Sequence, residues 1–313
     1  MERVRHLGFS LGIRLQRGCR HSASDVEPIA NVLFDPKHAS QISILRLSCI
    51  PAGWMPMLSR LSHMHTLHLS QCPNPIEFCT PFSSSLESPV TLTHIEALEL
   101  DIRVGLLEDS SPQHLKFPSL KTLCIQAAER PNLPDSLVIF CHRLSAALIT
   151  LELMEFITCG DEFSRRLFCS GKSLKLETLK LIECDTFNLT SVVRALTPGE
   201  DHLNPKPLPS LRQLVLIPQP VVENGSEELE EFEAKSRGIV ERALLLPLLH
   251  MLQKRGDGIH SRLRVQIPRL DFHCVPAARY GFYQLLKERR IEIYSTASRF
   301  NLGRQYSTDL ELI

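Results

Sequence analysis

Three histidines and two cysteines near the start of the chain are the side chains best suited to binding a metal ion. They are His63, His65, His68, Cys72 and Cys79. Zinc is usually held by four such side chains that converge as a tetrahedron. If the histidines lie on a strand, the His68 side chain points to solvent while Cys72 turns into the next loop, so the two diverge. We therefore expect no metal site and no cofactor.

Sequence motifs of catalysis are also absent. The chain has no phosphate-binding glycine loop, no G-x-S-x-G nucleophile motif and no C-x-x-C pair. Adjacent carboxylates occur at Asp161 with Glu162 and at Glu227 with Glu228. Neighbours in sequence do not face each other on a helix, so neither pair is suited to acid–base catalysis. We expect no catalytic residues, and a protein that is not an enzyme.

Bulk composition excludes further classes of function. The chain has 313 residues, with 35 Lys and Arg against 35 Asp and Glu, so its formal net charge is zero. This balance gives no general attraction to nucleic acid or to an anionic membrane. The longest nearly apolar run, residues 243–252, is far shorter than the ~20 residues that span a bilayer. The 10 cysteines are scattered, which favours a reducing compartment, the cytoplasm or the nucleus.

The elements that would position any functional residue follow a repeat. The pattern L-x-x-L-x-L, with Ile or Met sometimes in place of Leu, recurs along the chain. Its middle leucines are 22 to 35 residues apart, and they are Leu45, Leu67, Leu98, Leu123, Leu151, Leu179 and Leu214. A short strand places the second and third apolar residues of the pattern on one face, and the next segment returns the chain to start another strand. One unit cannot bury its apolar face alone, so the units must stack.

This stacking predicts an α/β fold. We expect an irregular leucine-rich-repeat solenoid, or horseshoe, with a curved parallel sheet and with helices on its convex side. The sequence between strands predicts helices over Asp135–Ala147, Asp161–Cys169 and Thr190–Leu196. The seven middle leucines should be buried in one row. A helical bundle would need longer periodic runs than these six-residue segments.

Residues 1–24 form an N-terminal segment that precedes the repeat domain. Phe9, Leu11 and Ile13 alternate with polar or small residues, which favours a first strand. A helix is the alternative, and the excess of arginine over acidic residues also fits a targeting segment.

The repeat domain itself covers residues 25–295, and residues 296–313 form a loose tail. The domain contains an acidic helical insertion at about 223–255, which is either a docking helix or a solvated face. After the insertion we expect two more strands and a helix, over Leu263–Ile267, Ile291–Ile293 and Pro276–Arg290.

Several segments resemble the leucine-rich-repeat part of fungal F-box-type proteins. They are His65–Cys72, Phe117–Leu123 and Leu176–Cys184, and the resemblance covers roughly residues 27–295. It implies an array that captures a protein substrate, while an upstream F-box holds the Skp-type adaptor of a ubiquitin ligase. The sequence has no F-box, so we do not expect this chain alone to bind the adaptor. In the family an Asn or Cys follows the third apolar position by three residues and bonds to loop backbone, and here Cys72 and Cys184 stand there.

The residues that face the concave side are the remaining candidates for a site. The residue between the two inner leucines of each unit forms a column. The charged and histidine members of this column, with Asp101 from the column beside it, are the candidate partner-binding residues Arg46, His68, Glu99, Asp101, Glu152 and Lys180. Strand propensity does not favour Glu or Lys, so the presence of these charged residues on strands is not explained by local structure. A solvated sheet face is the alternative.

Two functions fit this surface. The first is a protein–protein interaction module related to ubiquitin-ligase substrate receptors, whose partner brings a basic segment to Glu99, Asp101 and Glu152. The second is an enzyme regulator, such as a GTPase activator built on the same repeat, which would need a polar or arginine-bearing loop at one rim.

Overall fold

The computed structural model describes the chain in segments. These are residues 9–13, 30–47, 57–69, 90–101, 115–126, 135–144, 147–156, 161–169, 175–198, 207–219, 243–255, 263–267, 276–287 and 291–294. The chain divides into two compact units, residues 1–152 and 153–313. Both combine parallel strands with helices, as the repeat predicts for an α/β fold.

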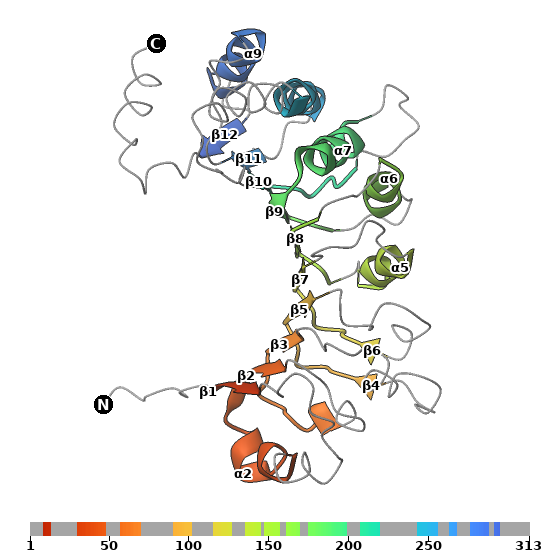
Figure 1. The fold of residues 1–313 in the computed structure, drawn as a ribbon, viewed down its shortest axis with the longest axis vertical. Coiled ribbons are helices and arrows are strands. Elements are labelled where there is room, and N and C mark those ends of the chain that lie inside the picture. The colour runs from red at the N-terminus through yellow and green to blue at the C-terminus, as the bar shows by residue number, and fades with distance from the viewer. Residues whose placement is uncertain are drawn as a thin grey trace, which may run out of the picture. The chain divides into compact units, whose positions relative to one another are not determined.

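Unit 1 is built on parallel strands in the order β1-β2-β3-β5-β7 (Figure 1). Their bounds are Phe9–Ile13 for β1, Ile42–Leu47 for β2, Thr66–Leu69 for β3, Ala97–Asp101 for β5 and Thr122–Gln126 for β7. The predicted first strand is confirmed, because β1 pairs with β2 in parallel register. The next strand, β8 (Thr150–Met154), contains the boundary between the units.

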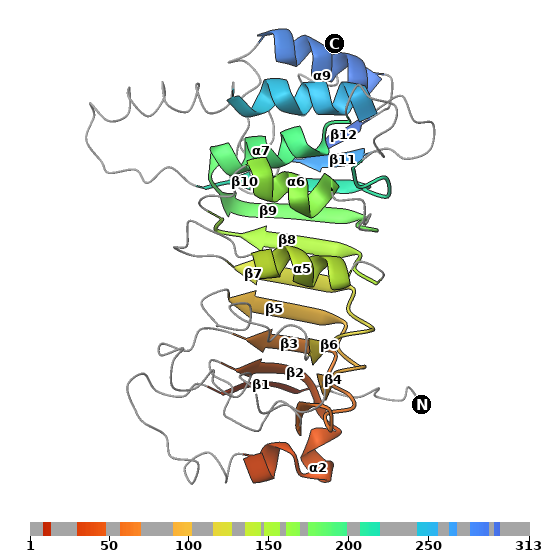
Figure 2. The same ribbon diagram turned by 90° about the vertical axis from the view of Figure 1, so that its right-hand side faces the viewer.

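Unit 2 continues with parallel strands in the order β9-β10-β11-β12 (Figure 2). They span Thr178–Cys184, Gln213–Pro218, Leu263–Gln266 and Ile291–Tyr294. The last two strands match the prediction from the sequence to within one residue.

The helices of unit 2 pack against one side of its strands (Figure 2). Helix α6 spans Asp161–Cys169 as predicted and packs on α7, and α7 contacts both β9 and β10. Helix α7 spans Thr186–Leu196 and so begins four residues before the predicted Thr190. It begins there because the Asp185 side chain accepts hydrogen bonds from the amides of Phe187 and Asn188 and caps the helix.

Two further helices follow in unit 2. One covers residues 243–255 and continues across Pro247. The other is α9, Pro276–Lys287, three residues shorter than predicted. The Arg255 guanidinium, at the end of the first, donates to the backbone carbonyls of Pro207 and Leu208. Burial of this charge lowers the Arg255 pKa to about 10.

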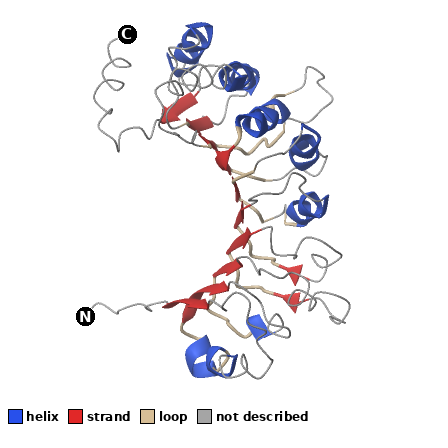
Figure 3. Ribbon diagram, viewed as in Figure 1, coloured by secondary structure: helices blue, strands red, loops and turns tan. Residues whose placement is uncertain are grey.

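In unit 1 both helices and short strands lie on one side of the main strands (Figure 3). Helix α5 spans Asp135–Arg143, four residues shorter than predicted. Two short strands, β4 (Val90–Thr91) and β6 (Leu115–Lys116), pair in parallel on the same side as α5. Each has only two residues, which is too short for an alternating pattern to predict. Phe117 after β6 meets Phe140 of α5 edge to face, with ring centroids 6.3 Å apart. A short helix, α2, spans Pro36–Ala39 before β2.

The core of each unit is a ladder of aligned leucines. All seven middle leucines of the repeat are at most 2% exposed, which confirms the predicted burial. In unit 1, Leu45, Leu67, Leu98 and Leu123 are direct register partners from strand to strand. In unit 2, Leu179 pairs with Leu214, and Leu214 pairs with Val265.

At the starts of the strands one backbone carbonyl serves two amides of the next strand. The carbonyl of Glu96, for example, accepts the N–H groups of Lys121 and Thr122 at 2.8 and 2.9 Å. The carbonyls of His65, Lys121 and Glu177 do the same for the strands that follow them. These shared acceptors hold each strand in register with its neighbour.

At the ends of β8 and β9 the chain turns through equivalent residues. Glu155 and Glu183 have φ values of 57° and 54°, in the left-handed region. The buried Cys184 thiol then donates to the carbonyls of Leu153 and Ile182 at 3.6 and 3.5 Å. Its burial raises the pKa of this thiol to about 12, so it stays protonated. Cys184 thus bonds to backbone as the resemblance implies, but both acceptors belong to the strands β8 and β9 and not to a loop.

Several expectations fall on residues outside the described segments. They concern the acidic stretch 223–242, the tail 296–313, the side chain of Asp101, and Cys72. Among the helices that the structure does describe, none is both long enough and apolar enough to cross a membrane.

Candidate functional site

The candidate site is the face of the strands that lies opposite the leucines. In β7 and β8 the burial alternates strictly, with Leu123, Ile125, Leu151 and Leu153 buried and the residues between them half-buried. This period of two places every second side chain on the opposite face. In unit 1, α5 and the β4–β6 pair lie on one side of the strands (Figure 1). Because the leucines are buried, we take this as the side of the leucines, and no described element of unit 1 covers the opposite face.

The predicted column is formed in unit 1 by direct register partners. Arg46 pairs with His68, His68 with Glu99, and Glu99 with Cys124. Adjacent strands lie about 4.8 Å apart, so long side chains in this column reach one another. The structure therefore brings Arg46, His68 and Glu99 together on one face.

Within this column His68 and Glu99 form a direct contact. The His68 Nδ1 and Glu99 Oε2 atoms are 2.6 Å apart, and the two side chains are 24% and 40% exposed. The pKa of Glu99 is held below its ordinary value, mainly by the hydrogen bond from His68 and against the effect of burial. The charges of His68 and of Arg46 lower the same pKa further.

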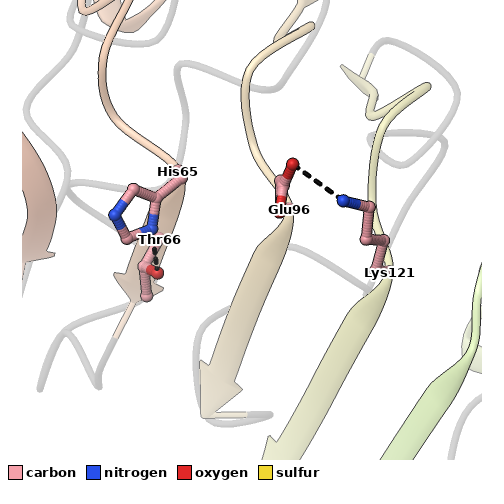
Figure 4. Close-up of polar contacts among 4 residues, drawn as sticks. All are labelled: His65, Thr66, Glu96 and Lys121. Atoms are coloured by element: carbon pink, nitrogen blue, oxygen red, sulfur yellow. Dashed lines mark hydrogen bonds and ion pairs between the residues drawn. The ribbon is translucent and has the colours of Figure 1, made fainter.

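A second row of charges lies at the strand starts, where sequence reasoning did not look for a site (Figure 4). The Lys121 ammonium donates to the Glu96 carboxylate at 2.9 Å, and both side chains are about half exposed, at 52%. The hydrogen bond and charge of Lys121 lower the pKa of Glu96. Beside them, His65 Nδ1 lies 2.9 Å from the Thr66 hydroxyl. His65, Glu96 and Lys121 each precede a middle leucine of the repeat by two positions. This position in the repeat would have identified the row from the sequence.

The other predicted site residues lie elsewhere in the chain. Glu152 is half-buried on β8 at the last position of unit 1, and Lys180 is half-buried on β9 in unit 2, in register with Val215. Asp101 ends β5 as the register partner of Gln126. Only Arg46, His68 and Glu99 of the predicted set are thus shown to form one cluster.

The same face of unit 2 has a different chemistry. Beside Lys180 and the buried Val215, it presents the half-buried side chains of Ile182 and Ile217, which are register partners. The position corresponding to Glu99 therefore changes from a carboxylate in unit 1 to an ammonium or an aliphatic side chain in unit 2.

The arrangement in unit 1 can bind charged and polar groups. The cluster supplies a guanidinium, an imidazole and a carboxylate on a surface that solvent reaches. Cys124, the next member of the column, is a half-buried thiol. Searches against protein-family models, curated proteins and solved structures find no match for this chain.

Proposed function

We propose that the chain is a protein–protein interaction module whose partner binds the face of the strands opposite the leucines. In this proposal the strands belong to an irregular leucine-rich-repeat solenoid, and the chain acts as a substrate- or partner-binding relative of ubiquitin-ligase receptors. The aligned cluster of Arg46, His68 and Glu99 is the observation that carries the proposal.

The placement of these charges favours binding over a passive solvated surface. Arg46, His68 and Glu99 stand in positions where β-branched or aromatic residues would suit a strand better. The same column has Arg46 at one end and Glu99 two strands away. This separation of positive and negative charge can fix the orientation of a bound partner.

We infer a partner with a basic segment, because Glu99 and Glu152 are carboxylates that the structure describes on this face, and the sequence adds Asp101 to them. A cation of the partner would approach Glu99 from the side of Cys124, since Arg46 repels it from the other side. Complementary charges of this kind act mainly on the rate of association.

Site-specific photo-crosslinking tests which face binds. A photoreactive amino acid replaces Thr122, which is half-buried on the opposite face of β7, and in the control it replaces Ile139, which is exposed on α5. In cells of the native organism, the Thr122 variant should give a protein adduct that the Ile139 variant lacks. Adducts only from Ile139 would show that the helix side is the binding side.

Charge reversal then tests the chemistry with the partner identified in that adduct. The variants Glu99→Lys and Glu152→Lys should slow association with the purified partner, measured by surface plasmon resonance, more than the matched Glu162→Lys variant on the exposed side of α6 does. Thermal melts establish that all three variants fold. Equal association rates in all variants would contradict a basic partner.

A further inference from the structure

The contact between His68 and Glu99 joins the proposed binding carboxylate to an imidazole. The two side chains come from adjacent strands, β3 and β5, and are register partners. Both are partly exposed, so protons and a partner can reach them. Histidine is the side chain whose charge ordinarily changes between pH 5 and 8.

The contact places one nitrogen of the imidazole against the carboxylate. The His68 Nδ1 atom lies 2.6 Å from an oxygen of Glu99, and a carboxylate oxygen can only accept, so Nδ1 is the nitrogen that carries the hydrogen of the neutral imidazole. A second proton would then add to Nε2. Protonation therefore changes the net charge of the pair from −1 to 0.

Other charged and titratable groups near His68 and Glu99 contribute to the net charge at the proposed binding surface. Among the side chains that the structure describes, those on the face itself are Arg46 on β2 and Cys124 on β7, while His65, Glu96 and Lys121 lie at the strand starts. Glu96 and Lys121 neutralise each other through their own 2.9 Å contact. Arg46, His68 and Glu99 together carry no net charge when His68 is neutral, and a charge of +1 when it is protonated.

From this geometry we propose that His68 makes partner binding at this face dependent on pH, with a basic partner bound when His68 is neutral and released when His68 is protonated. This inference rests on the proposed function of the same face. Arg46 keeps its charge throughout, so a cation of the partner docks on the Glu99 side of His68, over β5 and β7.

The test uses the full chain and a defined basic probe. The probe is a fluorescein-labelled nine-residue peptide in which lysines alternate with glycine and serine, and it stays positively charged at pH 5.5 and at pH 8.0. Its affinity is measured by fluorescence anisotropy at both pH values and at constant ionic strength. Wild type should bind about tenfold more tightly at pH 8.0, because one unit charge a few ångströms from a bound cation in a partly solvated site has an effect of this size.

Three variants separate His68 from its neighbours. His68→Gln keeps an amide donor for Glu99 but cannot gain a proton, so its affinity should be nearly equal at the two pH values. The control His65→Gln removes the neighbouring histidine and should keep the tenfold ratio. Glu99→Gln should bind weakly at both pH values. Thermal melts at both pH values show that each variant is folded.

The outcomes distinguish this inference from the proposed function. The role of His68 is overturned if the ratio of affinities at the two pH values persists in His68→Gln. It is also overturned if wild type shows no such ratio although Glu99→Gln still weakens binding. In both cases Glu99 remains a binding residue. Binding that does not depend on Glu99 overturns both the inference and the basic partner. The Thr122 and Ile139 crosslinks then still decide which face binds a protein.

Discussion

Side chains along each strand divide by position into those that hold the sheet and those that face outward. In β5, Leu98 and Leu100 are 2% and 3% exposed, while Glu99 between them extends its carboxylate to the opposite face. A change at one kind of position should therefore alter stability, and a change at the other should alter binding. Glu99 is a partial exception, because its contact with His68 links the surface to folding.

The lowered pKa of Glu99 makes this contribution to stability dependent on pH. Because the pKa is lower in the folded chain than its ordinary value of 4.5, the folded state favours the ionised carboxylate. The contribution is complete above that value and is lost as the pH falls towards the folded-state pKa. Glu99→Gln should therefore be less stable than wild type at pH 6, and this difference should shrink as the pH falls from 5 to 3. Urea unfolding monitored by circular dichroism at each pH measures it, and a difference that grows on acidification would contradict the lowered pKa.

At the scale of elements, the start of α7 depends on one carboxylate. The Asp185 side chain accepts the amide hydrogens of Phe187 and Asn188 at 2.5 and 3.1 Å. Asn188 in turn donates its side-chain amide to the carbonyl of Phe156 at 2.5 Å, so the cap also fixes the helix to the end of β8.

Removal of this cap should destabilise unit 2. Asp185→Ala should cost about 0.5–2 kcal/mol in the free energy of unfolding, the usual range for loss of an N-cap side chain. Asp185→Asn retains an acceptor oxygen and should lose much less. Urea unfolding of both variants provides the comparison, and equal losses would show that the charge matters rather than the hydrogen bonds.

The contact of α9 with the helix over residues 243–255 depends on a glycine. A Cβ atom at Gly281 would lie 2.5 Å from Cδ2 and 2.9 Å from Cδ1 of Leu249, closer than atoms can pack. Glycine at this position therefore permits the two helices to approach, although it lowers the helix propensity of α9.

A double-mutant cycle tests this close approach. Alanine would gain about 1 kcal/mol in helix propensity over glycine, whereas overpacking typically costs about 1–3 kcal/mol. Gly281→Ala should thus fail to stabilise the chain in wild type but should stabilise it in a Leu249→Ala background. Unfolding free energies of the four proteins give the coupling. Full stabilisation by Gly281→Ala alone would mean that the helices do not touch there.

At the scale of the whole molecule, each described strand depends on its neighbours for burial. Leu151 is fully buried on β8, at the end of unit 1. The amide of Thr150 donates to the carbonyl of Lys121 before β7, and the amide of Glu155 donates to Ile182 of β9. A cavity at Leu151 should therefore loosen the adjacent strands first.

Leu151→Ala should destabilise the chain by about 2–5 kcal/mol, the range for a buried leucine. If the strands belong to a solenoid, hydrogen exchange should quicken most in β7 and β9 and progressively less in strands further along the chain. Ile149→Ala, at a position 40% exposed, is the matched control and should change little. Uniform loss of protection across all strands would contradict a repeat array.

The alternation and spacing of apolar residues predict which residues become neighbours on adjacent strands, but not how their side chains are oriented. Leu67 and Leu98 were predicted as neighbours because the repeat aligns them, and the same alignment predicted Arg46 beside His68 and Glu99. The 2.6 Å contact within that column depends on side-chain rotamers, which a spacing does not specify. The start of α7 was missed because its Asp185 cap lies before the apolar periodicity begins. The Glu96–Lys121 pair was missed because residues just before a strand have no fixed alternation.

The shared carbonyls at the strand starts have a consequence for how such a gene can change. The intervals between successive middle leucines are 22, 31, 25, 28, 28 and 35 residues, yet Leu45, Leu67, Leu98 and Leu123 remain aligned. Codons can therefore be inserted or deleted between strands while the leucine ladder and the outward column are inherited intact. A single codon gained inside a strand would instead turn its leucines outward and its charges inward. Natural variation in length should accordingly accumulate between the strands, and new binding specificity should arise there or by substitution in the outward column.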